Sequence, residues 1–332
     1  MKTMSELIQQ EKKCRFEKLY EFIIKIFDTS DEEDFEDKQE KTLKLGELIQ
    51  ECCKDDIGLI GDVGVLHNVS VELAKHDYYD FACNILEKGL SDKKYYLNID
   101  LLADYLKYAI YSTYENLKKA DKYYERLKMV EKGKWNWRAF DFSIDYLLAL
   151  SEMEDVNRNS IFDEALELAL IYKRLMKGTE NEDKAYHTLA EVYLKRGERK
   201  KFETIIKEGI QLKKAPLCTL KWAEYLFDKG EYVEAKKYII ECCRMNTEID
   251  SKINLGYPYI LSALSRIMVL YNDFDENEDE QMNEVQDELN RIDHDYNSAK
   301  MVLGESEGRV KNLKVQIDIL KNQLNQSIDD YE

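Results

Sequence analysis

Apolar and polar residues follow a helical period along most of this chain. The clearest case is the stretch APLCTLKWAEYLF and, after it, DKGEYVEAKKYIIECC (residues 228–243). Apolar side chains recur there every three or four residues, which places them mostly on one face of a helix. They are Leu217, Leu220, Trp222, Ala223 and Leu226 before Gly230, and Tyr232, Ala235, Tyr238, Ile239 and Cys242 after it. Because Gly230 offers a permissive backbone and Ala223 and Ala235 allow close approach, the pattern predicts a helix–turn–helix hairpin.

A single hairpin cannot bury its apolar face alone, so further copies are expected. Thirty-three residues earlier, Leu189, Ala190, Tyr193 and Gly197 stand where Trp222, Ala223, Leu226 and Gly230 stand. Weaker copies place other residues at the position of Ala235, namely Ala82, Ala120, Ala165 and Phe202. We expect about five units from roughly residue 62 to 250, one or two helices before residue 60, and one more helix pair or a capping helix over NLGYPYILSALSRIMVLYN.

This pattern resembles the tetratricopeptide repeat family. The family's unit has a small residue at its eighth position, Gly at the fifteenth, an aromatic residue at the seventeenth and Ala at the twentieth. Ala223, Gly230, Tyr232 and Ala235 match all four, while the preceding unit matches at Ala190 and Gly197 and departs at Arg199 and Phe202. The resemblance covers a little over half of the chain. It implies an all-α superhelical solenoid in which the first helix of each unit lines a concave, partner-binding surface.

The C-terminal part has a different period. Apolar residues follow an unbroken 4-3 spacing that is typical of a left-handed coiled coil, broken in chemistry only by Ser306 between Gly304 and Gly308. The pattern predicts either one long helix or two antiparallel helices hinged at the glycines, and the preserved register favours one helix. Its seam needs cover from a second copy, a partner helix or the solenoid. The predicted oligomerisation residues are Leu289, Ile292, Leu303, Val310, Leu313, Ile317, Leu320 and Leu324.

The composition favours helices, and the distribution of charge indicates where the segments of the chain begin and end. The chain of 332 residues has 2 prolines and 13 glycines, which leaves few turn signals for strands. Two acidic runs, at 28–40 and 273–284, supply −14 of the net charge of −18. Their high density of acidic residues predicts a loop at the first run and a linker at the second. The expected organisation is N-terminal helices over 1–60, a solenoid over 61–272, a linker over 273–284 and a coiled coil over 285–328. No apolar run is long enough for a membrane span and the N-terminus is too charged for a secretory signal, so a cytoplasmic protein is expected.

Catalytic and metal-binding chemistry has little support in the sequence. The seven cysteines include the pairs Cys52–Cys53 and Cys242–Cys243 but no CxxC, so buried free thiols are expected. The four histidines have no carboxylate or cysteine constellation in sequence, and no nucleophile-elbow motif is present. We therefore expect no enzyme activity, no metal and no cofactor.

Two basic islands offer a binding chemistry. Residues 92–138 carry eleven Lys and Arg against seven acids, and residues 195–221 carry nine against three. By analogy with tetratricopeptide adaptors that hold acidic peptide ends, the candidate partner-binding residues are Lys107, Tyr108, Tyr111, Lys134, Trp135, Trp137, Arg138, Lys195 and Lys221. The alternative is that these lysines are ordinary solvated side chains on helix surfaces, with no role in binding. Nucleic acid is disfavoured because both acidic runs would repel phosphate. A further hypothesis is that an acidic run masks a basic island, and unchanged partner affinity after deletion of residues 28–40 would contradict it.

The function expected from these features is a non-catalytic scaffold or adaptor. It would bind a protein or peptide, acidic ones included, in the solenoid groove and assemble through its C-terminal coiled coil. The alternative is a ligand-gated regulatory subunit that controls an associated effector enzyme. Because fold does not determine the ligand, the sequence leaves the partner unnamed.

Overall fold

The computed structural model describes residues 18–21, 23, 44, 46–47, 63–75, 77–154, 156–249, 256–273, 281–304 and 308–329. Every regular element in these ranges is helical, as the all-α prediction requires. The acidic run at 28–40, Cys52–Cys53, most of the predicted N-terminal helices and much of the 273–284 linker lie outside the described residues.

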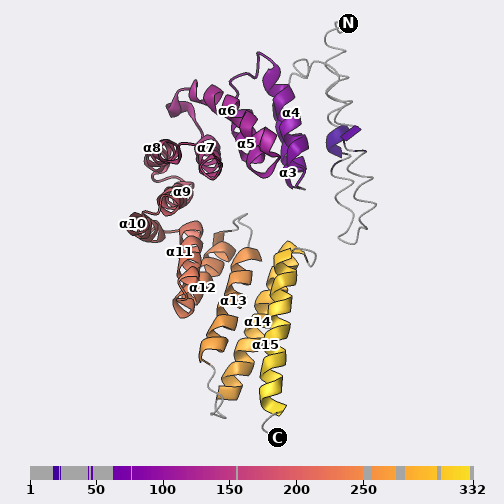
Figure 1. Cartoon of the computed structure of the whole chain (residues 1–332), viewed down its shortest axis with the longest axis vertical. Coiled ribbons are helices and arrows are strands. Elements are labelled where there is room, and N and C mark those ends of the chain that lie inside the picture. The colour runs from indigo at the N-terminus through magenta and orange to yellow at the C-terminus, as the bar shows by residue number, and fades with distance from the viewer. Residues whose placement is uncertain are drawn as a thin grey trace. The chain divides into compact units, whose positions relative to one another are not determined.

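The chain divides into two compact units, Met1–Lys177 and Gly178–Glu332, and the boundary falls inside the range predicted as one solenoid. In the first unit, successive helices pack as antiparallel hairpins, and the first helices α3, α5 and α7 also contact one another (Figure 1). Its elements are α3 (Val63–Lys75), α4 (Tyr79–Ser91), α5 (Ile99–Tyr111), α6 (Tyr114–Lys128), the short 3₁₀ helix η2 (Lys132–Lys134), α7 (Trp137–Leu150) and α8 (Arg158–Met176).

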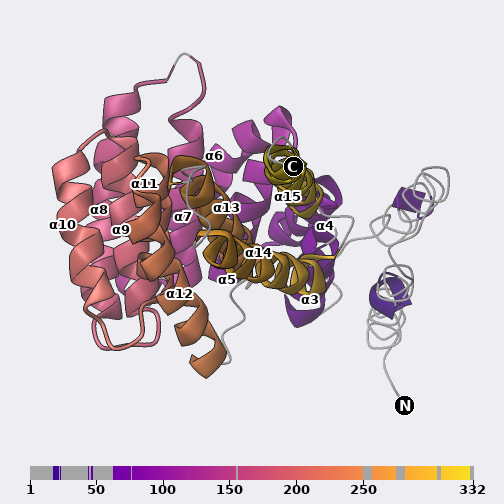
Figure 2. The ribbon, with the colours of Figure 1, turned by 90° about the horizontal axis from the view of Figure 1, so that it is seen from below.

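The second unit continues the pairwise packing and ends in three long helices. Helices α9 to α12 lie side by side (Figure 2), and α9 contacts α11 as α11 contacts α13. The elements are α9 (Glu182–Lys195), α10 (Arg199–Ile210), α11 (Pro216–Asp228), α12 (Tyr232–Ile249), α13 (Gly256–Asp273), α14 (Gln281–Leu303) and α15 (Gly308–Asp329). The five residues predicted to occupy the alanine position are all fully buried on second helices: Ala82, Ala120, Ala165, Phe202 and Ala235.

The turns after α3, α9 and α11 each contain a residue in the left-handed conformation. Gly230 has φ +79°, and the Glu231 and Gly230 amides donate to the carbonyls of Leu226 and Phe227, both at 2.9 Å. This is the Schellman arrangement that glycine favours after a helix. Gly197 repeats it after α9, and Asp77, with φ 64°, occupies the same place between α3 and α4. The turn at Asp77 therefore has the same backbone geometry as the glycine turns, although the sequence pattern lacks its glycine there.

Phe202, which departs from the repeat pattern, fills the core of the second unit. Its ring lies 4.7 Å from that of Tyr225 and 6.4 Å from that of Trp222. The larger side chain is fully buried and packs against aromatic rings of α11, the first helix of the next unit.

The preference for one long C-terminal helix is wrong. Helix α14 ends at Leu303, Gly304 takes φ +86°, and α15 begins at Gly308. The two helices are antiparallel neighbours, since Lys321 pairs with Asp293 at 2.7 Å while Lys314 lies over the Tyr296 ring at 5.7 Å. The hinged alternative describes the structure, because a left-handed glycine ends the helix without disturbing the spacing of the apolar residues.

The heptad seam is buried within the chain. Ile292, Val310, Leu313, Ile317 and Leu320 are at most 2% exposed and pack with Ile260, Ala263 and Ile267 of α13, and Leu289, Leu303 and Leu324 are partly buried against the same cluster. Part of the seam is thus covered by α13, which lies inside the range predicted as the solenoid. The assignment of these residues to oligomerisation stays a prediction, but their burial needs no second chain.

Candidate partner-binding site

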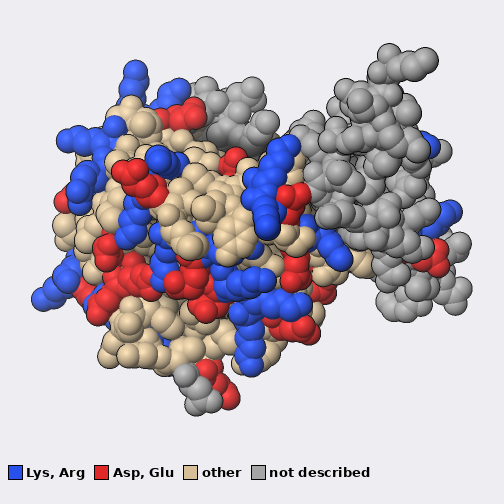
Figure 3. Space-filling model, turned by 90° about the horizontal axis from the view of Figure 1, so that it is seen from above, with Lys and Arg blue, Asp and Glu red and all other residues tan. Residues whose placement is uncertain are grey.

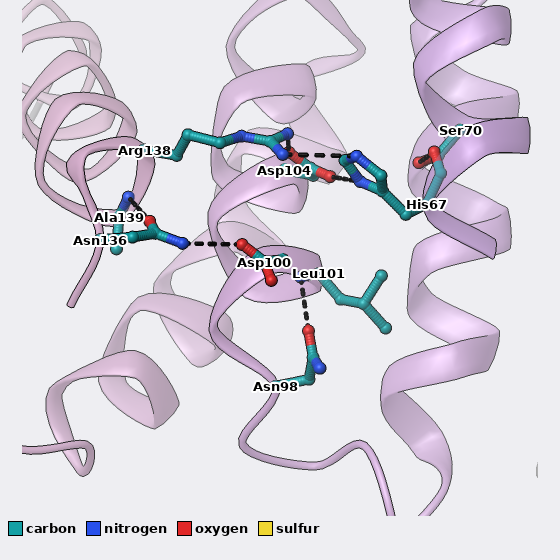
Figure 4. Close-up of polar contacts among 9 residues, drawn as sticks. All are labelled: His67, Ser70, Asn98, Asp100, Leu101, Asp104, Asn136, Arg138 and Ala139. Carbon is teal, nitrogen blue, oxygen red and sulfur yellow. Dashed lines mark hydrogen bonds and ion pairs between the residues drawn. The ribbon is translucent and has the colours of Figure 1, made fainter. Parts of the chain in front are cut away.

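The helices that carry most candidate residues begin at asparagine caps. The side chain of Asn98 accepts a hydrogen bond from the Leu101 amide at the start of α5, and Asn136 accepts from the Ala139 amide at the start of α7, both at 3.0 Å. Asn136 also donates to Asp100 at 2.7 Å (Figure 4). These bonds satisfy free amides at each helix start and fix α5 against α7.

A row of polar side chains crosses α3, α5 and α7. The fully buried Asp104 carboxylate lies 2.6 Å from His67 Nδ1 and forms an ion pair with Arg138 (Figure 4). Arg138 Nη1 lies 3.4 Å from His67 Nε2, so both ring nitrogens of His67 are engaged. A buried charge is stabilised when it is paired, and Arg138 supplies that pairing for Asp104 while His67 adds a hydrogen bond.

Lys107 and aromatic rings form the adjoining surface. Lys107 Nζ lies 2.6 Å from Asp145 on α7, and it also lies within 5.4 Å of the ring centres of Tyr111 and Phe142. Burial lowers the pKa of Lys107, but the Asp145 carboxylate outweighs it and the pKa is raised. Tyr111 is 55% exposed and its ring centre is 5.3 Å from that of Tyr79. We call Tyr79, Lys107, Tyr111, Arg138, Phe142 and Asp145 the α5–α7 face.

The other predicted residues of the first unit have different environments. Trp135 is 4% exposed, packs on Phe140 at 5.2 Å and donates from Nε1 to the Val130 carbonyl at 3.1 Å. Tyr108 is 8% exposed. Both are core side chains, and their assignment to partner binding stays a prediction. Lys134 is exposed on η2, and Trp137 packs edge-on against Phe142 at 6.1 Å, next to the α5–α7 face.

Lys221 and Lys195 belong to the second unit. Lys221 on α11 pairs with Glu191 on α9 at 2.8 Å and with Glu224 at 3.4 Å, and Lys195 is exposed on α9. Burial raises the pKa of Glu191, but His187, Lys221 and Lys195 outweigh it and the pKa is lowered. The predicted residues therefore form two sets, one in each unit.

Both basic islands contain lysines that pair with carboxylates, as Lys221 of the second island does with Glu191. On the face drawn in Figure 3, Lys and Arg are interspersed with Asp and Glu. Several island lysines pair with acids of a neighbouring helix, as Lys128 does with Glu164 at 3.3 Å and Lys132 with Glu167 at 2.8 Å. The excess of lysines in the sequence is thus partly cancelled by acids that lie outside the island.

Sequence reasoning missed His67, Asp104, Phe142 and Asp145. His67, Asp104 and Arg138 are 37 and 34 residues apart, and Lys107 and Asp145 are 38 apart. These separations match the spacing of the repeats, so they bring equivalent positions of neighbouring first helices together. A search for opposite charges one repeat apart would have found both ion pairs.

The described cysteines are free and mostly buried, and burial raises the pKa of Cys83 and of Cys243 to about 12. Such thiols are protonated at neutral pH and unreactive. Among the described residues, no three His, Cys, Asp or Glu side chains are grouped so as to hold a metal ion. None of the described helices has the length and apolar character needed to cross a membrane.

Comparison with known proteins gives distant structural matches. No protein-family model matches the chain, and no curated protein matches it significantly. Among solved structures, a tetratricopeptide repeat protein from Parabacteroides merdae ATCC 43184 is similar over 90% of this chain and 99% of its own, with 16% identity and a TM-score of 0.49. The human IFIT1 dimer with PPP-AAAA is similar over 94% of this chain and 70% of its own, with 12% identity and a TM-score of 0.45.

Proposed function

We propose that this chain is a non-catalytic scaffold of tetratricopeptide type that binds a protein or peptide on the α5–α7 face. The observation that carries the proposal is the exposed ring of Tyr111 on α5, which lies between Tyr79, at the start of α4 in the preceding unit, and the paired Lys107 of α5. Aromatic side chains with a fixed conformation bind partners at a low entropic cost. Helical hairpins in series supply a rigid frame for such a surface.

The chemistry of the polar row also favours binding over catalysis. A general base needs a nitrogen or oxygen that can reach a substrate proton. Both nitrogens of His67 already contact protein groups, and its partner Asp104 is fully buried. The row serves to join α3, α5 and α7, which keeps the neighbouring face in a single conformation.

The partner that fits this face is a segment with an apolar or aromatic side chain. Lys107 and Arg138 are each paired with a carboxylate of this chain, so an acidic peptide would have to displace Asp145 or Asp104. Desolvating a paired charge gains little, whereas burying the exposed part of Tyr111 gains free energy from apolar area. We therefore expect an acidic segment to bind this face less tightly than a segment with an apolar or aromatic side chain.

Quantitative capture of partners from the native cell tests the proposal. Tyr111→Ala should reduce the amount of a specific partner at least about tenfold. Tyr114→Ala is the matched control, because Tyr114 is 60% exposed on α6, outside the face. Equal loss in both variants, or in neither, would contradict binding at this face. Asp145→Asn releases Lys107, so tighter binding by that variant would identify an acidic partner instead.

A ligand-gated regulatory subunit remains a second candidate. The specific observation in its favour is a cavity of about 340 Å³ between α9, α10 and α11. Pockets of this size are typical of small-molecule sites. If a small ligand altered partner capture by the α5–α7 face, the regulator would replace the constitutive scaffold as the better description.

A further inference from the structure

The cavity of the second unit has both charges and an apolar surface. It is lined by Leu194, Arg199, Lys221, Glu224, Tyr225, Asp228 and Lys229. Tyr225 is only 9% exposed, so its ring forms part of a fixed wall. The Tyr225 hydroxyl donates to Glu203 at 2.8 Å and Lys229 Nζ lies over the ring, so only the small exposed part of the ring lines the cavity.

Most charged groups of the lining are already neutralised. Lys221 pairs with Glu191 and Glu224, and Lys229 pairs with Glu203 at 3.1 Å while lying over the Tyr225 ring at 4.3 Å. These groups form a closed set in which each cation has a carboxylate. Binding a further ion to any of them would require breaking an existing pair.

Arg199 and Asp228 differ from the rest. Both are exposed, and no hydrogen bond or ion pair joins the side chain of either one to another described residue or to each other. The same cavity thus offers one unpaired guanidinium and one unpaired carboxylate. A ligand with only a negative charge would meet Asp228 and Glu224, and one with only a positive charge would meet Arg199.

We propose that this cavity binds a small zwitterion of the α-amino acid class. The ligand carboxylate pairs with Arg199, which can donate two parallel hydrogen bonds, and the ligand ammonium pairs with Asp228. An apolar side chain packs on Leu194 and the ring of Tyr225. The α5–α7 face contributes no residue to this site, so the proposal does not depend on the proposed scaffold function.

Calorimetric titration of the full chain with the standard amino acids, and then with blocked forms of the tightest one, tests the proposal. For leucine the blocked forms are N-acetylleucine, which keeps only the carboxylate, and leucine amide, which keeps only the ammonium. We expect the free amino acid to bind at least about tenfold more tightly than either blocked form, because each removes one charged hydrogen bond. The blocked forms also mimic the C-terminus and the N-terminus of a peptide, so they separate a free amino acid from a peptide end.

Matched variants locate the site. Arg199→Gln and Asp228→Asn should each weaken binding about tenfold. Lys200→Gln and Glu231→Gln should not, because both residues are exposed nearby and neither lines the cavity. Circular dichroism confirms that all four variants stay folded. The proposal is overturned if no standard amino acid binds, if a blocked form binds as well as the free one, or if the control variants lose as much affinity as the cavity variants.

Discussion

Gly230 illustrates a residue that is required by backbone conformation and not by space. Beyond the two neighbouring residues of the chain, the nearest atom to a Cβ added there would be the Tyr232 hydroxyl at 4.0 Å, yet φ is +79°. We expect Gly230→Ala to lower the free energy of unfolding by about 1 kcal/mol, because a side chain disfavours the left-handed conformation. Urea denaturation measures the change. Gly133→Ala is the control, since Gly133 has similar space without a positive φ, and an equal loss in both would contradict the backbone explanation.

The pair of Glu191 and Lys221 predicts a pH dependence. A carboxyl whose pKa is lowered by folding adds stability above its unfolded pKa, and that stability is lost as pH falls through the folded pKa. The pKa of Glu191 is lowered, and Lys221 is one cause. Lys221→Met should therefore cost about 1 kcal/mol at pH 7 and progressively less below about pH 4.5.

Urea denaturation of both proteins at a series of pH values checks this expectation. Lys237→Met provides the control, because Lys237 is 66% exposed and, among the described residues, pairs only with Glu234 on the same helix. Such exposed pairs contribute little to stability. A cost of Lys221→Met that stayed constant from pH 7 to about pH 3.5 would mean that lost packing, and not the ion pair, is responsible.

Helices α13 and α14 meet at a glycine. A Cβ on Gly256 would lie 2.2 Å from Leu303 Cγ, a distance that real contacts do not reach. Gly256→Ala should force α14 away from α13 and cost about 1 to 3 kcal/mol in thermal unfolding. In a Leu303→Ala background the same change should cost less than about 0.5 kcal/mol, because the shortened side chain makes room. Additive losses would show that the two residues do not touch.

The hairpins could be predicted from sequence because their signals are local. The offsets of Ala223, Gly230, Tyr232 and Ala235 reflect one turn and one close approach, and both lie within a single unit. The turn at Asp77 has the same geometry without a glycine, so the repeated turn occurs in the structure at a place where the sequence pattern does not show it.

The ion pairs of the candidate site could not be predicted as readily. They depend on which residues of neighbouring units are adjacent, and the irregular spacing of the repeats obscures that register. Lys107 therefore reads as a free cation in the sequence although Asp145 neutralises it in the structure. The C-terminal seam has the same difficulty, because a 4-3 spacing arises both in a dimeric coiled coil and in two helices that fold onto a third.

The buried seam leads to a prediction about the assembled state of the chain. Ile317 is fully buried among α13, α14 and α15, so Ile317→Glu places a charge in an intramolecular core. We expect faster amide exchange in α13 to α15 and a loss of at least about 3 kcal/mol in stability, with the native molecular mass by sedimentation unchanged. Val315→Glu is the matched control, because Val315 is 54% exposed on the same helix and should tolerate the charge. If Ile317→Glu instead reduced the native mass while the three helices kept their protection, the seam would hold copies together and the intramolecular packing would not be its main role.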